Sequence, residues 1–229
     1  MLNKIEQTRL AFIKSGKKII NLSSGNPNEH GLFFDQKKLQ KIAKKYFYTK
    51  HSYTPDPKGN IKARQAIQSF YQAHGLTISP DQIIITSGTS ESYLYLFKML
   101  ANAKEEILFP NPTYPLFEEI ARLANIKLSF YKLNEKNNWQ PDLKDMEAQI
   151  SNNTKAIVLV SPNNPTGSVI QKNTLLSIVK LAEKYHLPII SDEVFSEFIF
   201  DNKKFPQLAG LSKATPIFTL QGLSKTYAL

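Results

Sequence analysis

The sequence predicts an α/β fold in which a mostly parallel sheet is sandwiched between helices. From Ser79 onward, short apolar runs alternate with segments of helical length. Strands separated by single helices form right-handed βαβ units, and these units build parallel sheets with helices on both faces. Strands are expected at residues 82–86, 107–109, 126–131, 156–160, 188–191 and 217–220. Upstream, apolar spacing predicts a short strand at 19–22 and helices within 2–18, 39–47 and 61–70.

The composition indicates a globular protein of 229 residues. The chain is 41% hydrophobic and 21% charged, which is enough apolar material for a substantial core. The net charge of +10 comes mainly from scattered lysines, because only Arg9, Arg64 and Arg122 are arginines. No block combines clustered basic residues with interleaved aromatic residues, so we expect no nucleic-acid partner.

The absence of cysteine excludes disulfides, thiolate metal sites and cysteine nucleophiles. The N-terminus lacks the apolar stretch of a signal peptide, and no run of about 18 apolar residues occurs. We therefore expect a cytoplasmic protein with no membrane partner. The four histidines show no spacing typical of metal ligands, so no metal site is expected.

Ligands of parallel sheets bind beyond the carboxyl ends of the strands, so the residues after each strand are candidates. Residues 86–90 (Thr-Ser-Gly-Thr-Ser) open a helix whose apolar face includes Tyr93. Their N–H groups and hydroxyls suit a phosphate, although hydroxyl residues also cap helices. Tyr114 lies among three prolines, where its ring either stacks on a flat ligand or covers the core.

Three further strand ends carry polar side chains. Asn164 lies between two prolines in the turn 161–167, which holds its amide in one orientation. Asp192 ends an apolar strand, where a buried carboxylate needs a donor such as a protonated ring nitrogen, unless it is a structural cap. Lys225 follows the last strand, where its amine is a candidate for Schiff-base chemistry.

Taken together and in this order, these segments resemble the class I/II aminotransferases, the pyridoxal-phosphate enzymes of fold type I. The matching positions run from Gly25 to Lys225, and the steps from Asn164 to Asp192 and on to Lys225 are 28 and 33 residues. The resemblance implies a homodimer that uses pyridoxal 5'-phosphate to transfer an amino group from an amino acid to a 2-oxo acid.

The resemblance also implies a domain division. Residues 1–50 would be an N-terminal segment contributing to the small domain and the substrate loop. Residues 51–229 would form an incomplete cofactor-binding large domain. Tyr53 resembles the tyrosine that reaches the phosphate of the partner subunit, and Arg64 matches a helix arginine with a structural role.

Individual roles follow from the same resemblance. Lys225 would hold the cofactor as a Schiff base and move protons, and Asp192 would pair with the pyridine nitrogen. Asn164 would bond the phenolic oxygen beside the substrate, Tyr114 would stack on the ring, and Gly25 would lie near the substrate carboxylate. The other expected cofactor contacts are Gly88, Thr89, Ser90 and Ser224.

Two positions depart from the family pattern. Phe195 stands where a tyrosine usually donates to the phenolic oxygen, so Asn164 would make that contact alone and the pH optimum would differ from that of relatives. Gly222 stands where the family often has a phosphate-binding serine.

The sequence stops at Leu229, shortly after Lys225, whereas the family continues much further. The arginines that would bind the phosphate and the substrate carboxylate are therefore expected to be missing. The antiparallel strand between the first and sixth strands and most of the small domain would also be missing. A chain of this length is expected to be unstable and inactive alone, because unpaired strand edges and apolar surface would be exposed.

Three other interpretations stay open at this point. A pyridoxal-phosphate-dependent carbon–sulfur lyase would use the same Lys225, Asp192 and Asn164, and it would release an oxo acid without an amino acceptor. A truncated remnant, or half of a split enzyme, would account for the length. A phosphate-binding α/β protein would explain residues 87–90 but neither Asn164 nor Lys225, and no dinucleotide or P-loop motif is present.

Overall fold

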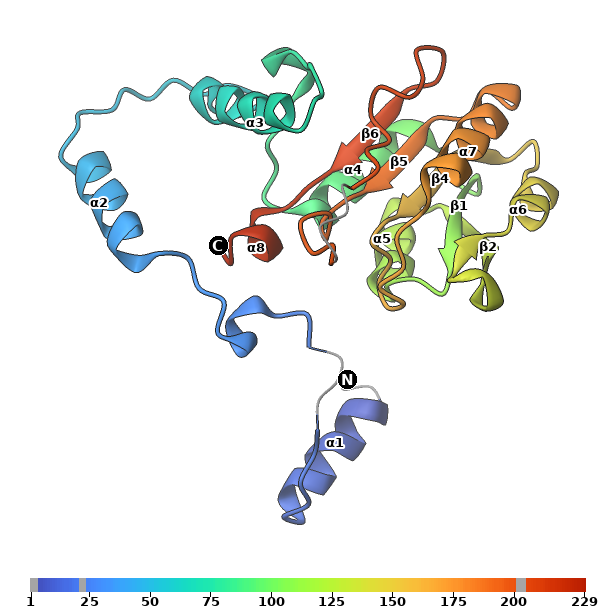
Figure 1. The fold of residues 1–229 in the computed structure, drawn as a ribbon, viewed down its shortest axis with the longest axis horizontal. Coiled ribbons are helices and arrows are strands. Elements are labelled where there is room, and N and C mark those ends of the chain that lie inside the picture. The colour runs from blue at the N-terminus through green and yellow to red at the C-terminus, as the bar shows by residue number, and fades with distance from the viewer. Residues whose placement is uncertain (1–3, 21–23, 201–204) are drawn as a thin grey trace.

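A computed structural model of the protein describes residues 4–20, 24–200 and 205–229. An α/β body contains all the strands of the described chain, and the N-terminal segment follows an extended path outside this body (Figure 1). That segment carries α1 (Lys4–Lys14), the short 3₁₀ helix η1 (Pro27–His30) and α2 (Gln36–Phe47). It leads into α3 (Ile61–Ala73) and the 3₁₀ helix η2 (Pro80–Gln82).

The sheet has the strand order β3-β2-β1-β4-β5-β6. Neighbouring strands are parallel except for β3, which is antiparallel to β2. The observed topology confirms the mostly parallel sheet that the sequence predicts. The strands are β1 (Glu106–Asn111), β2 (Lys127–Asn134), β3 (Gln140–Pro141), β4 (Thr154–Val160), β5 (Ile189–Asp192) and β6 (Ile217–Leu220).

Helices cover both faces of the sheet and bury two separate apolar clusters. Successive strand residues point to opposite faces, so Phe109 of β1 packs with α4 and α5, whereas Leu108 packs with α6 and α7. In β4, Val158 and Ile157 divide between the two clusters in the same way. The helices of the body are α4 (Thr89–Leu100), α5 (Leu116–Ala124), α6 (Leu143–Gln149), α7 (Lys172–Lys184) and α8 (Leu223–Thr226), with the 3₁₀ helix η3 (Glu135–Asn137) between β2 and β3.

The strand predicted at residues 82–86 is wrong. The 3₁₀ helix η2 covers the start of this range, and Ile84 and Ile85 are exposed. A strand requires a hydrogen-bonded neighbour as well as an apolar pattern, and the Ile85 N–H instead donates to the Lys58 carbonyl at 3.0 Å. Of the strand predicted at 19–22, residues 19–20 are irregular and 21–22 lie outside the described residues.

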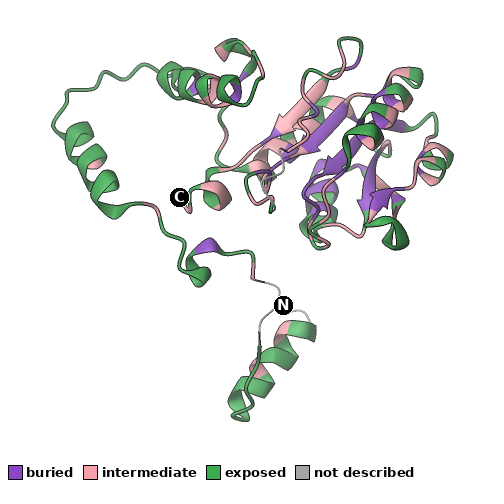
Figure 2. Ribbon diagram, in the orientation of Figure 1, coloured by how far each residue is buried: buried purple, intermediate pink, exposed green. Residues whose placement is uncertain are grey.

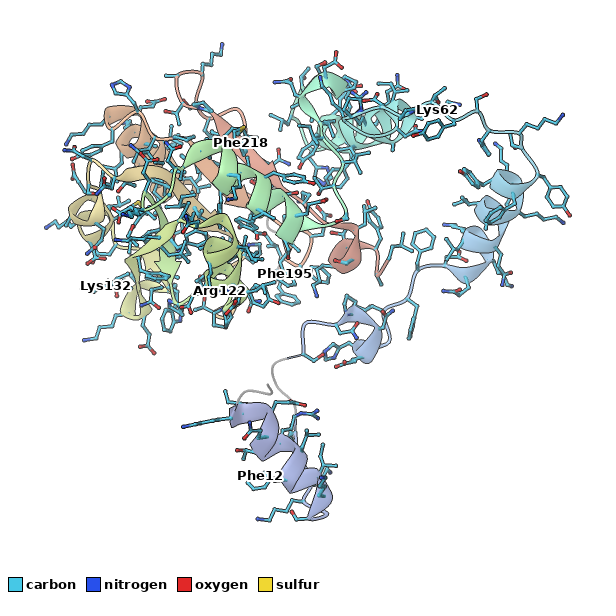
Figure 3. The ribbon with its side chains drawn as sticks, turned by 180° about the vertical axis from the view of Figure 1, so that it is seen from behind. Phe12, Lys62, Arg122, Lys132, Phe195 and Phe218 are labelled. Carbon is cyan, nitrogen blue, oxygen red and sulfur yellow. The ribbon has the colours of Figure 1, made fainter. Side chains whose placement is uncertain are left out.

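Helices α1 and α2 form where apolar spacing predicts them, but neither has a buried residue. Both are mostly exposed in Figure 2, and Phe12 lies on α1, apart from the α/β body, in Figure 3. The apolar side of α2 includes Phe47, which is 82% exposed. The local sequence pattern therefore predicts α1 and α2 correctly, although neither helix packs its apolar side against the rest of the described chain.

Arg64 joins α3 to the segments on either side of it. Its buried guanidinium donates to the carbonyls of Gly59 and Pro80 at 3.0 and 2.9 Å. It also forms ion pairs with Asp56 at 2.7 Å and Asp81 at 3.4 Å. These contacts give Arg64 the structural role that the sequence predicts.

Replacing Ile157 by alanine should lower the free energy of unfolding by about 2–5 kcal/mol, because Ile157 is fully buried in a central strand. Ile84→Ala is the matched control, and it should change stability by less than about 0.5 kcal/mol because Ile84 is 65% exposed. Urea denaturation of the two variants measures the difference. Equal losses would contradict this account of the core.

Candidate active site

The candidate site lies where three parallel strands, β4, β5 and β6, end at the same level of the sheet. Val160 of β4 pairs in register with Asp192 of β5, and Asp192 pairs with Leu220 of β6. The segments that follow these strands therefore start at one edge of the sheet. Those segments carry Asn164 and Lys225, so three of the side chains predicted from sequence meet there.

A cavity of about 1340 Å³ lies at this edge. Phe195 lines the cavity, and so do Tyr93 and Asn163, which the sequence did not single out as site residues. The predicted site residues along its wall are Gly25, Thr89, Ser90, Tyr114, Asn164, Asp192 and Lys225.

Three predicted residues do not line the cavity. Gly88 lies at the N-cap of α4, directly before two residues that do line it. Ser224 is exposed on α8. Tyr53 is 92% exposed in the segment before α3.

The Lys225 side chain reaches from α8 to the N-terminal segment. Its Nζ donates a hydrogen bond to the Gly25 carbonyl at 2.9 Å, although the two residues are 200 positions apart. A Cβ atom added to Gly25 would lie 4.0 Å from the Phe195 ring, so the loop also approaches that side chain. The loop at Gly25 is therefore part of the cavity wall.

Asp192 presents a carboxylate to the cavity with one donor on each oxygen. The Val194 N–H donates to Oδ1 at 3.1 Å, and the Tyr93 hydroxyl donates to Oδ2 at 2.9 Å. Burial raises the pKa of Asp192, and the two hydrogen bonds act in the opposite direction. The sequence pattern predicted only that Tyr93 lies on the apolar face of a helix. The signal that could have identified it is the hydroxyl itself, because a buried tyrosine needs a hydrogen-bond partner.

The turn after β4 is held by Asn163 and leaves Asn164 at the cavity. The buried Asn163 Oδ1 accepts from the backbone N–H and the hydroxyl of Thr166, at 3.2 and 3.0 Å. Its Nδ2 donates to the Pro112 carbonyl at 3.3 Å, which ties this turn to the segment after β1. The Asn163 side chain therefore stabilises the turn, and both asparagines line the cavity.

The N-terminus of α4 adds hydroxyls and a helix dipole to the same wall. Its N-cap, Gly88, has no side chain to accept from the first-turn N–H groups. The Ser87 N–H and hydroxyl donate to Glu91 at 2.7 and 3.0 Å. Thr89 and Ser90 line the cavity. Positively polarised N–H groups at a helix start suit an anion.

Glu193, next to Asp192, is a buried acid that the sequence did not single out. Its Oε1 accepts from the Ser191 hydroxyl at 2.9 Å. Burial raises the pKa of Glu193 to about 7, and the charge of Asp192 adds to the increase, while hydrogen bonds from Ser191 and Leu208 lower it.

The comparisons with known proteins identify the family. A profile described as "Aminotransferase class I and II" matches residues 17–229. The chain belongs to this family, which confirms the resemblance found in the sequence.

Named relatives are aminotransferases with different substrates. The chain is 35% identical to the glutamate-pyruvate aminotransferase AlaA of Escherichia coli, over 93% of this chain and 53% of that protein. It is 31% identical to the tyrosine aminotransferase of Mus musculus, over 92% of this chain and 47% of that protein. The chain thus spans about half the length of these curated relatives.

Solved structures show the same fold. An alanine aminotransferase from Pyrococcus furiosus matches with a TM-score of 0.87 at 30% identity, over 96% of this chain and 56% of that one. An aminotransferase from Escherichia coli matches with a TM-score of 0.88 at 32% identity, over 99% and 56%. These matches agree with the α/β architecture described above.

The described residues also bear on two other properties, membrane spanning and metal binding. Every helix among them is too short or too polar to cross a lipid bilayer. No group of three or more His, Cys, Asp or Glu side chains in the described ranges is placed to hold a metal ion.

The raised pKa of Glu193 predicts that this residue makes the fold less stable as the pH rises. Between about pH 4.5 and 7, the folded chain keeps a proton that the unfolded chain releases, so the stabilising contribution present at low pH is lost. Relative to Glu193→Gln, the wild type should lose on the order of 3 kcal/mol across this window. Urea denaturation at several pH values measures it.

The exposed Glu118→Gln is the control for this titration and should track the wild type across the window. If the difference in unfolding free energy between the wild type and Glu193→Gln does not change with pH, the raised pKa assigned to Glu193 is wrong.

Proposed function

We propose that this chain holds pyridoxal 5'-phosphate in the described cavity. We also propose that it contributes the cofactor site of an enzyme that transfers an amino group from an amino acid to a 2-oxo acid. The observation that carries the proposal is the set of groups at one sheet edge. An amine, a carboxylate, an amide, an aromatic ring and a helix N-terminus line a single cavity in a member of the aminotransferase family.

The residues present fit the cofactor group by group. The Lys225 amine suits an aldehyde, and the Asp192 carboxylate suits a protonated ring nitrogen. The first turn of α4, with Thr89 and Ser90, suits a phosphate. The Tyr114 ring, which is 43% exposed, has a face available for stacking. These groups therefore favour pyridoxal phosphate over a simple phosphate ligand, because a simple phosphate would not explain Asp192 and Lys225 in the same cavity.

When bound, pyridoxal phosphate supplies a ring that takes up the electron pair left on the substrate when its α-proton departs. Lys225 Nζ would hold the cofactor at its aldehyde carbon, with the aldehyde oxygen lost as water. Once displaced by the substrate amine, Nζ would accept and return the α-proton. Asp192 would hold a proton on the ring nitrogen, and Asn164 would donate to the phenolic oxygen. Phe195 has no hydroxyl to share that last contact.

The N-terminal part of the chain supports the proposed division into residues 1–50 and 51–229. Helices α1 and α2 bury nothing in the described chain, which favours a segment that packs against further protein. The exposed Tyr53 is free to reach the phosphate of a partner subunit in a homodimer. The Gly25 loop and Asn164 would lie beside the substrate. The absence of cysteine favours action in the cytoplasm.

Borohydride reduction after incubation with pyridoxal phosphate should fix one phosphopyridoxyl group, at Lys225, and peptide mass spectrometry should locate it. Lys225→Ala should reduce the label at this peptide at least tenfold, because no other lysine among the described residues lines the cavity. Lys127→Ala is the matched control, since Lys127 is exposed at the start of β2, and it should label like the wild type. Label spread over surface lysines and unchanged in Lys225→Ala would overturn the proposal.

Any transfer that the loaded chain carries out on L-alanine or L-glutamate should yield the 2-oxo acid and pyridoxamine phosphate in equal amounts, since one amino group moves per cofactor. The names of the relatives suggest these two substrates first. Chromatography of both products measures the ratio. Sustained release of pyruvate, ammonia and sulfide from L-cysteine, which has a β-leaving group, without an amino acceptor would point instead to elimination chemistry.

A further inference from the structure

Tyr93 combines full burial with a single polar contact, and that contact is made to a residue of the cavity. Its side chain is 1% exposed, and its hydroxyl donates to Asp192 Oδ2 at 2.9 Å. The two residues are 99 positions apart and come from α4 and the end of β5. Burial raises the pKa of Tyr93 well above its usual range, and the neighbouring Asp192 adds to the increase. The hydroxyl therefore keeps its proton and acts as a donor.

The ring of Tyr93 is held by other aromatic side chains. Its centroid lies 4.7 Å from that of Phe117, 5.6 Å from that of Phe97 and 6.4 Å from that of Phe109. A ring packed this way has few alternative rotamers, so the direction of the hydroxyl is set by the core. The contact to Asp192 is thus a rigid one.

We propose that Tyr93 is a positioning residue for Asp192. In this role its hydroxyl fixes the orientation of the carboxylate and keeps it ionised, so that Asp192 holds the proton on the ring nitrogen of the cofactor. The identity of that cofactor rests on the proposed function. A donor to the carboxylate makes Asp192 a weaker base, so the proton stays on the ring nitrogen. Phenylalanine at position 93 would fill the same space without this effect.

Other titratable side chains of the described residues lie near Asp192 or near Tyr93. Glu193 follows it in the chain and carries its own hydrogen bond to Ser191. Lys225 lines the same cavity from α8. Tyr131 of β2 lies close enough to Tyr93 to raise its pKa, but its hydroxyl donates to the Val158 carbonyl at 2.9 Å.

Tyr131→Phe is therefore a matched control for Tyr93→Phe. Each variant removes one buried hydroxyl and one 2.9 Å hydrogen bond, but only Tyr93 touches Asp192. The first readout needs no cofactor. Carboxyl ¹³C NMR of the full 229-residue chain follows the titration of Asp192, with Asp192→Asn assigning the resonance. Circular dichroism confirms that each variant is folded.

Tyr93→Phe should raise the Asp192 midpoint by about one pH unit or more, whereas Tyr131→Phe should shift it by less than about 0.3 units. Equal shifts in the two variants, or no shift in Tyr93→Phe, would overturn the proposal. If Tyr93→Phe does not fold, the wild type labelled with 3-fluorotyrosine replaces it. Its more acidic hydroxyls should lower the midpoint, and an unchanged midpoint would count against the proposal.

The second readout uses ¹⁵N-labelled pyridoxal phosphate bound to the same variants. At neutral pH a smaller fraction of the ring nitrogen should carry the proton in Tyr93→Phe than in the wild type or in Tyr131→Phe, because the more basic Asp192 carboxylate takes more of the proton that the two groups share. If the Asp192 midpoint shifts but protonation of the ring nitrogen does not change, Tyr93 contacts Asp192 without positioning it for the cofactor, and the proposal is overturned. If the cofactor does not bind at Lys225 at all, the proposed function fails, and the carboxyl midpoints alone decide whether Tyr93 controls Asp192.

Discussion

The parallel hydrogen-bonded ladder of β4, β5 and β6 determines where the chemistry of this chain lies. The ladder fixes Val160, Asp192 and Leu220 at one level, and the three strands end together. Asn164, Asp192 and Lys225 then meet although they are far apart in the sequence, because parallel strands deliver their carboxyl ends to the same edge. A register shift in any of the three strands would separate the amide, the carboxylate and the amine.

Helix α4 links the apolar core to this edge. Its first turn carries Thr89 and Ser90 at the cavity, and its next turn carries Tyr93, whose ring packs against Phe117 while its hydroxyl meets Asp192. A carboxylate in such surroundings is costly unless donors satisfy it. The packing of the helix thus helps a charged group to persist beside the core.

The sequence predicts much of this arrangement, because apolar periodicity locates the central strands and parallel topology places Asn164, Asp192 and Lys225. The sequence-based prediction fails where an element depends on contacts with other segments of the chain. The apolar segment 82–86 is no strand because nothing in the described chain pairs with it. The roles of Tyr93 and Glu193 depend on contacts or burial that spacing does not reveal, and so does the stabilising role of Asn163 in the turn after β4. The match to the aminotransferase family agrees with the motifs, whereas the exposed α1 and α2 show that helix-forming pattern does not ensure packing.

A crystal structure of this chain grown with pyridoxal phosphate tests the central claim most directly. Electron density for the cofactor should be continuous with Lys225 Nζ, with the ring nitrogen at the Asp192 carboxylate and the phosphate at the first turn of α4. Density for the cofactor on a surface lysine, with the cavity holding only solvent, would contradict the account. A cofactor bound in the cavity with its phosphate away from Thr89 and Ser90 would contradict the assignment of the helix N-terminus.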